Sequence, residues 1–131
     1  MANILVSVIG NDVHAVANKV IVKLLREDGH EVWNIGVAAK PKEIIDAIIE
    51  FSPNLVLIGS LNGEINFWAK NFKTAFDKLG FCDIKIFIGG NIGYGDLEQK
   101  NKKYLTKLGF HAVFGPRDDI ETLLASIKME F

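Results

Sequence analysis

A histidine and an aspartate lie close together in a short loop near the start of the chain. The segment from Gly10 to Val16 reads Gly-Asn-Asp-Val-His-Ala-Val, so that Asp12 precedes His14 by two residues. Histidine is the commonest metal ligand, and a ligating imidazole usually donates its second ring N–H to a carboxylate or carbonyl. Asp12 and His14 could form such a pair. On these residues alone, a plainer interpretation is favoured, in which Asp12 caps a helix and His14 is a solvated loop residue.

The other reactive or charged side chains do not indicate a second functional site. Cys82 is the only cysteine, which excludes an internal disulfide and a cysteine metal cluster. Its neighbours are typical of a small hydrophobe entering a buried strand. Lys100, Lys102, Lys103 and Lys107 have a spacing more typical of the solvated face of one helix than of a phosphate-binding strip. The 15 basic and 16 acidic residues give a net charge of −1, which does not favour nucleic-acid binding.

Short apolar runs alternate with amphipathic segments along the chain. Continuous apolar runs that end at glycine are typical of strands buried on both faces, and apolar residues at helical spacing predict the helices between them. Strands are expected at 4–9, 31–35, 55–58, 84–88 and 112–114. Helices are expected at 16–28, 41–49, 67–79 and 97–108, and from 119 onward.

This alternation predicts the α/β class, with a parallel sheet covered by helices on both faces. The length of 131 residues fits one domain, 1–131. Among doubly wound folds, the flavodoxin-like strand order 2-1-3-4-5 suits five strands best, and ligands bind beyond the carboxyl ends of the strands. Glycines follow these expected ends at 10, 36, 59, 89 and 115. Each glycine alone is uninformative, because strands of any α/β protein commonly end in glycine.

The sequence lacks the motifs of three other classes of protein with related α/β folds. The first loop is not a phosphate cradle rich in serine, threonine and glycine, as a flavodoxin requires. A response regulator needs an aspartate after the third strand and a lysine after the fourth, where Gly59 and Gly89-Gly90 stand. The glycine-rich segment 90–95 follows the fourth strand, whereas a dinucleotide-binding motif follows the first. The start of the chain lacks the basic region and the small-residue cleavage site of a signal peptide, and no apolar run reaches ~18 residues. We therefore expect no signal peptide and a soluble, cytoplasmic protein without a membrane partner.

Three short motifs at the strand ends resemble the signature of cobalamin-binding domains. These motifs are Asp12-Val13-His14 after the first strand, Ser60-Leu61 after the third and Gly89-Gly90 after the fourth. They are similar to the D-x-H-x-x-G, S-x-L and G-G motifs of adenosylcobalamin mutases and cobalamin-dependent methionine synthase. The chain most resembles the small subunit of glutamate mutase (methylaspartate mutase), over essentially its whole length.

The resemblance implies a mode of binding. Cobalamin would bind with its dimethylbenzimidazole base detached from cobalt and His14 in its place, and Asp12 would be the hydrogen-bonded partner of His14. Gly89 and Gly90 would line a slot for the nucleotide tail. The residues implied to bind the cofactor are Asp12, Val13, His14, Ala15, Ala17, Gly59, Ser60, Leu61, Asn62, Gly89, Gly90 and Asn91. His14 is the implied cobalt ligand, and no catalytic residue is implied in this chain.

Two residues depart from the family pattern. Ala17 stands where the first motif has its glycine, which adds a methyl group near the implied tail slot. Gly59 stands where the S-x-L motif has its serine, a hydroxyl that would hold the Asp12 carboxylate. Ser60 is adjacent, but successive side chains of a strand point to opposite faces. The loop at 62–64 is also slightly shorter than in the family.

The resemblance further implies a function. The chain would be the cobalamin-binding subunit of an adenosylcobalamin-dependent carbon-skeleton mutase, an isomerase, most similar to glutamate mutase. The cofactor would carry the radical chemistry. A larger, barrel-type catalytic subunit would bind the amino-acid substrate, so this chain would be inactive alone. Two alternatives stay open, namely a stand-alone corrinoid carrier or sensor module without mutase activity, and a flavodoxin-like adaptor that has lost cofactor binding.

Overall fold

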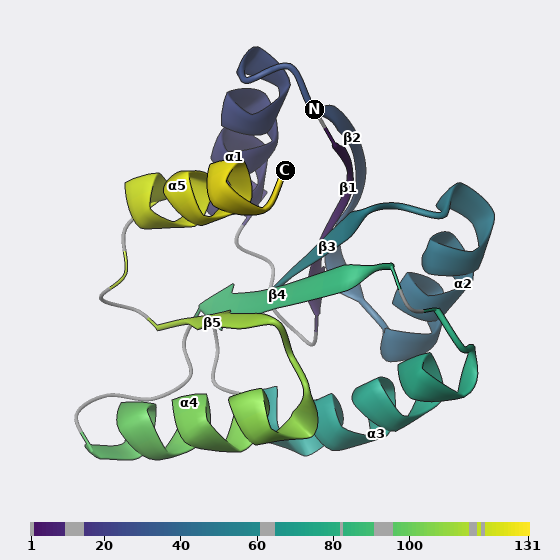
Figure 1. Cartoon of the computed structure of the whole chain (residues 1–131), viewed down its shortest axis with the longest axis vertical. Helices are drawn as coiled ribbons and strands as arrows, with labels where there is room; N and C mark the ends of the chain where they lie inside the picture. Colours follow the sequence, from purple (N-terminus) through teal and green to yellow (C-terminus); the bar gives the residue numbers. More distant parts are fainter. Residues whose placement is uncertain are drawn as a thin grey trace.

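Five parallel strands form one sheet in the order β2-β1-β3-β4-β5, which is the order that the sequence predicts (Figure 1). The computed structural model describes residues 2–9, 15–60, 65–81, 83–90, 96–115, 118 and 120–131. Its strands are β1 (Asn3–Ile9), β2 (Glu31–Ala39), β3 (Leu55–Ser60), β4 (Lys85–Gly90) and β5 (Ala112–Phe114). Its helices are α1 (Ala15–Glu27), α2 (Pro41–Phe51), α3 (Ile65–Lys78), α4 (Asp96–Leu108) and α5 (Ile120–Glu130). The predicted flavodoxin-like α/β fold is confirmed.

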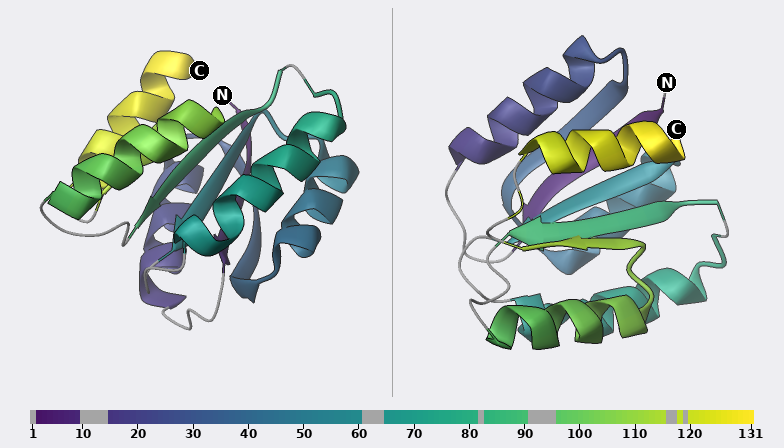
Figure 2. Two further views of the ribbon diagram at one scale, coloured as in Figure 1. Left: turned by 90° about the horizontal axis from the view of Figure 1, so that it is seen from below. Right: turned by 60° about the vertical axis from the view of Figure 1, so that its left-hand side comes forward.

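The sheet lies between two layers of helices (Figure 2). Helices α1 and α5 cover one face, and α2, α3 and α4 cover the other. Successive residues of a strand face opposite layers. In β1, Ile4 and Val6 belong to the cluster beneath α1 and α5, whereas Leu5 belongs to the cluster beneath α2, α3 and α4. Along a strand, successive side chains therefore pack alternately beneath one helical layer and beneath the other.

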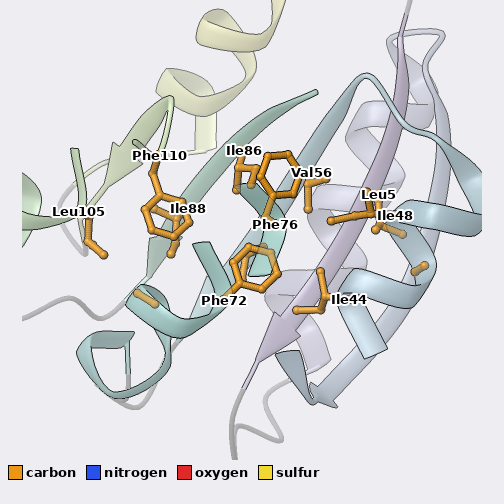
Figure 3. Packing of buried hydrophobic residues seen from close by; sticks show 13 residues of the cluster. Leu5, Ile44, Ile48, Val56, Phe72, Phe76, Ile86, Ile88, Leu105 and Phe110 are labelled. Carbon is orange, nitrogen blue, oxygen red and sulfur yellow. The ribbon is translucent and has the colours of Figure 1, made fainter. Parts of the chain in front are cut away.

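Aromatic side chains fill the layer beneath α2, α3 and α4 (Figure 3). Phe72 of α3 is 1% exposed, and its ring stacks on that of Phe110 with centroids 6.5 Å apart and planes 8° from parallel. Burial of one such side chain stabilises a fold by about 1.5–3 kcal/mol. This stack packs α3 against the segment that connects α4 to β5.

Helix α2 begins where the sequence predicts, at a proline. Pro41 occupies the first turn, where its missing N–H has no partner to lose. The Glu43 carboxylate accepts a hydrogen bond from the Lys40 backbone N–H at 3.2 Å. Ser52 ends the helix in the left-handed conformation, with φ of 46°. Local sequence thus sets both ends of this helix.

The edge strand β2 runs past the glycine at which the sequence analysis ends it. Its pairing with β1 shifts register twice near its end, and Gly36 there has φ of +86°. The Asn34 side-chain oxygen accepts a hydrogen bond from the Gly36 N–H at 2.9 Å. Gly36 therefore forms a bulge rather than a stop, because a positive φ bends a strand without ending its pairing. On the same strand, Arg26 of α1 donates to the Val32 carbonyl at 3.1 Å.

The edge at which the strands begin, here called the amino edge, is held by side chains. The Asn54 side-chain oxygen accepts a hydrogen bond from the Asn3 N–H at 2.9 Å. Glu130, at the end of α5, forms an ion pair with Lys85, the first residue of β4. The Nε2 of His111, which precedes β5, lies 3.2 Å from the Glu130 Oε1. These bonds tie the last helix to the beginnings of two strands. No helix in the described parts of the chain is long and apolar enough to cross a membrane.

Candidate cofactor site at the carboxyl edge

The residues predicted to bind a cofactor gather at the opposite edge, where the strands end, here called the carboxyl edge. Ala15 and Ala17 lie in the first turn of α1, Gly59 and Ser60 end β3, and Gly89 and Gly90 end β4. The other predicted residues, Asp12, Val13, His14, Leu61, Asn62 and Asn91, lie outside the described residues. The segments that contain them connect β1 to α1, β3 to α3 and β4 to α4.

Two glycines lie side by side on the central strands of this edge. The register pairs Val8 of β1 with Gly59, Gly59 with Gly89, and Gly89 with Phe114 of β5. Because Leu57 and Phe87, two positions earlier, pack beneath α1 and α5, Gly59 and Gly89 face that same layer. The sheet thus presents bare backbone on two adjacent strands, one residue inside its carboxyl edge. Bare backbone of this kind permits close approach of another group.

The space in front of Gly89 is partly taken by the chain itself. A Cβ placed on Gly89 would lie 3.0 Å from the Phe114 Cβ and 3.1 Å from the Phe114 carbonyl oxygen. Both distances are shorter than ordinary van der Waals contact. Any side chain at Gly89 would therefore displace β5 before it met a ligand. This close approach is a reason for glycine at this position that the sequence analysis did not find.

The two histidines of the described residues lie at the amino edge. His30 precedes β2, and its Nδ1 accepts a hydrogen bond from the Ala2 N–H at 3.0 Å. Burial and the nearby N-terminal amino group lower the pKa of His30, and Asp28 partly opposes them. His111 stacks on Phe87, with ring centroids 5.7 Å apart, and pairs with Glu130. Both imidazoles are engaged in holding the fold, far from the strand ends.

A buried carboxylate beside the end of β5 was missed by the sequence analysis. Glu98, in the first turn of α4, is 2% exposed and packs against Gly115. Lys102, one turn further along α4, lies with its Nζ 3.9 Å from Glu98 Oε1 and 3.0 Å from Asp118 Oδ2. Lys102 is therefore not part of a solvated face, although Lys100, Lys103 and Lys107 are exposed, as predicted.

An open groove of about 500 Å³ lies between α1 and β2. It is lined by Lys19, Val22, Lys23, Arg26, Glu27 and Asn34. Gly59 and Gly89, which the structure describes, do not line this groove. In the described segments, no group of three or more histidine, cysteine, aspartate or glutamate side chains could hold a metal ion. A metal carried by a macrocycle needs only one protein ligand, so this finding is compatible with the predicted histidine.

Known proteins are similar to this chain in sequence and in fold. The B12 binding domain family matches residues 2–125. The glutamate mutase sigma subunit of Treponema denticola is 35% identical over 130 residues, which are 98% of this chain and 93% of that protein. The sigma subunit of Clostridium tetanomorphum is 36% identical over 130 residues, which are 95% of this chain and 92% of that protein.

Two solved structures share the fold at low sequence identity. A cobalamin-binding protein from Desulfitobacterium hafniense has a TM-score of 0.75 at 18% identity, and this chain covers 58% of it. A methanol:cobalamin methyltransferase complex from Methanosarcina barkeri has a TM-score of 0.73 at 18% identity, and this chain covers 47% of the matched chain. The match covers 98% and 99% of this chain, respectively. The chain belongs to the B12 binding domain family and, within it, to the glutamate mutase sigma subunits.

Proposed function

We propose that this chain binds cobalamin at the carboxyl edge of its sheet, with the base detached from cobalt and His14 as the lower ligand. The observation that carries the proposal is the pair of glycines, Gly59 and Gly89, on adjacent central strands beneath α1 and α5. A chain whose backbone is bare at this point can admit a group between the sheet and a helical layer. The nucleotide tail released from cobalt is such a group.

The distribution of histidines supports His14 as the ligand. His30 and His111 have partners at the amino edge. His14 belongs to the segment between β1 and α1, which starts from the carboxyl edge. A ligating imidazole needs a partner for its second N–H, and Asp12 is the carboxylate nearest in sequence. In this proposal Asp12 fixes the tautomer of His14 and raises its basicity without touching cobalt.

We further propose that the holoenzyme is a carbon-skeleton mutase, most similar to glutamate mutase, and that its cofactor is adenosylcobalamin. When bound, adenosylcobalamin supplies an organic radical from its cobalt–carbon bond. The role of this chain is to bind the corrin, orient it and present its upper face. A larger, barrel-type subunit binds the amino-acid substrate over that face. The high coverage of the sigma subunits, 92–93% of the two relatives above, supports the same division of labour.

A spectral titration tests the proposal. Purified protein is titrated with hydroxocobalamin and adenosylcobalamin, and the absorbance change reports a base-off, histidine-ligated complex. Binding by the wild type and its loss in His14→Ala is the expected result. Addition of the large subunit of a relative's glutamate mutase should then give rearrangement of glutamate to methylaspartate. Cobalamin binding without rearrangement would favour a stand-alone corrinoid carrier or sensor, and absence of binding would favour an adaptor that has lost the cofactor.

A further inference from the structure

Phe114, the last residue of β5, and Gly115, which follows it, each lie close to a residue of another element, on opposite faces of the sheet. On one face, Phe114 approaches Gly89 so closely that a Cβ there would lie 3.0 Å from the Phe114 Cβ. On the other face, a Cβ on Gly115 would lie 2.0 Å from Glu98 Oε1 and 2.9 Å from the Glu98 carboxyl carbon. A side chain at Gly115 would force the Glu98 carboxylate to move, and a side chain at Gly89 would press on Phe114, so glycine at both positions lets Phe114 and Glu98 keep these places.

Glu98 is held in place by charge as well as by packing. Its side chain is 2% exposed, and a buried carboxylate is costly unless it is paired. Lys102 lies one helical turn away, with its Nζ 3.9 Å from Glu98 Oε1. The same ammonium group lies 3.0 Å from Asp118 Oδ2. Lys102 thus joins a buried carboxylate of α4 to a carboxylate of the turn that follows β5.

Asp118 in turn fixes the backbone of that turn. Its Oδ2 accepts a hydrogen bond from the Gly115 N–H at 2.7 Å, and its own N–H donates to the Gly115 carbonyl at 3.1 Å. The turn is therefore closed by reciprocal bonds and is tied to α4 through Lys102. Because Phe114 and Gly115 are consecutive, any shift of Gly115 changes the approach of Phe114 to Gly89.

We propose that Glu98, Lys102 and Asp118 are positioning residues that set the width of the tail slot at Gly89. They thereby determine the preference of this protein for complete corrinoids over corrinoids that lack the nucleotide. This inference rests on the proposed function. Gly89 lies one residue inside the carboxyl end of β4 and faces the layer of α1 and α5. In the proposed mode of binding, a flat macrocycle beyond the edge would not reach this point, whereas a tail between the sheet and the helices would.

The test compares two corrinoids in matched variants. Hydroxocobalamin carries the nucleotide tail, and cobinamide lacks it. Lys102→Met removes the shared ammonium group and keeps the length of the side chain. Lys103→Met, at the exposed neighbour on α4, is the control. Lys102→Met should weaken hydroxocobalamin binding by roughly 3- to 30-fold, the range of effects transmitted through a packed network, and leave cobinamide binding unchanged. Lys103→Met should change neither affinity.

Two results would overturn the inference and leave the proposed function intact. One is an equal loss of both corrinoids in Lys102→Met, which would show a general disturbance of the fold. The other is wild-type affinity for both corrinoids in that variant. Wild-type protein that binds neither corrinoid would instead overturn the proposed function, and the inference with it.

A thermal-melting cycle tests the fit of Glu98 and Gly115 without any ligand. Gly115→Ala should lower Tm strongly in the wild type, because the new methyl group overlaps the Glu98 carboxylate. In the background of Glu98→Ala the same methyl group has room, so the loss of Tm caused by Gly115→Ala should be much smaller. Contacting residues that act together show such non-additivity. Additive losses would show that the two residues are independent, and would overturn the inference.

Discussion

The two edges of the sheet use polar groups in different ways. At the amino edge, side chains bond to the beginnings of strands, as Asn54 does to Asn3 and Glu130 does to Lys85 and His111. At the carboxyl edge, Gly59 and Gly89 leave the backbone of the central strands bare. The contrast holds for the central strands β3 and β4, whereas the end of β5 is bonded through Gly115 and Asp118.

Substitutions at the two edges should therefore change different properties, the stability of the fold at one edge and the affinity for the cofactor at the other. Loss of a polar group at the amino edge removes bonds within the protein, so it should lower stability and leave cofactor affinity unchanged. Loss of His14 or Asp12 removes a group of the proposed cofactor site, so it should lower affinity and leave stability nearly unchanged. Four substitutions test this separation, from the largest expected effect to the smallest.

The largest effect is expected for His14. Electron paramagnetic resonance of the Co(II) form, prepared with nitrogen-15-labelled histidine, should show coupling to one histidine nitrogen in the wild type. His14→Ala should abolish this coupling, because no other histidine is proposed to reach cobalt. His111→Ala is the control at the amino edge, and it should lower Tm and keep the signal. An unchanged signal in His14→Ala would show that the ligand has been assigned wrongly.

Asp12→Asn should have the next largest effect. The amide cannot supply the charge that stabilises the imidazole as a donor, and loss of such a partner costs roughly 10–100-fold in metal affinity or activity. A cobalamin titration measures the affinity, and circular dichroism checks that the fold is retained. If the variant binds cobalamin as tightly as the wild type does, Asp12 is only a helix cap.

Gly59→Ser should tighten binding. A hydroxyl at this position could hold the Asp12 carboxylate toward His14. Such a hydrogen bond contributes about 0.5–1.5 kcal/mol between neutral partners and roughly 1.5–3 kcal/mol when one partner is charged, so a gain in affinity on the order of tenfold is expected. Gly59 lies inside β3, where it pairs with Val8 and Gly89. Serine readily adopts the extended backbone conformation of a strand. Affinity and Tm are measured together. Weaker binding at unchanged Tm would show that Gly59 is needed for close approach of the cofactor.

The smallest effect is expected for Glu130, and it depends on pH. Hydrogen bonds from Lys85 and His111 lower the pKa of Glu130 below its ordinary value of 4.5. The carboxylate therefore stabilises the fold above that value, and this contribution is lost as the pH falls through the lowered pKa. Glu130→Gln should lower the urea midpoint slightly at pH 7 and should make it fall less between pH 5 and pH 3, in a range that brackets about 4.5. Cobalamin affinity at pH 7 should not change; a loss of affinity would contradict the separation of the two edges.

Much of the fold follows from sequence pattern because each pattern has one physical cause. Apolar runs that end at glycine predict buried strands, and all five lie where expected, within a few residues. The largest boundary error concerns β2, which continues to Ala39. A glycine before a helix indicates the end of a strand, whereas Gly36 forms a bulge held by Asn34. Only the pairing with β1 distinguishes these two roles.

Two features of the carboxyl edge differ in how far the sequence predicts them. Glycines at strand ends indicate where a ligand can approach, and the register brings Gly59 and Gly89 together. Burial of Glu98 could not be predicted, because a glutamate among lysines on a polar helix is ordinarily exposed. Its burial depends on the space left by Gly115, which is distant in sequence and lies after a different strand. Such complementarity exists only once β5 and α4 have packed together.

The two hydrogen bonds on β2 also bear on how copies of this chain meet. An unpaired strand edge is a template on which another chain can add a strand, which leads to aggregation. Arg26 donates a hydrogen bond to the Val32 carbonyl, and the Asn34 side chain accepts one from the Gly36 N–H. These two backbone groups of β2 are therefore not available to pair with a foreign strand. The other border of the sheet, β5, is only 3 residues long. Extension of the sheet by a foreign strand is thus disfavoured at both borders, so a subunit of the proposed holoenzyme would not be expected to add a strand to this sheet.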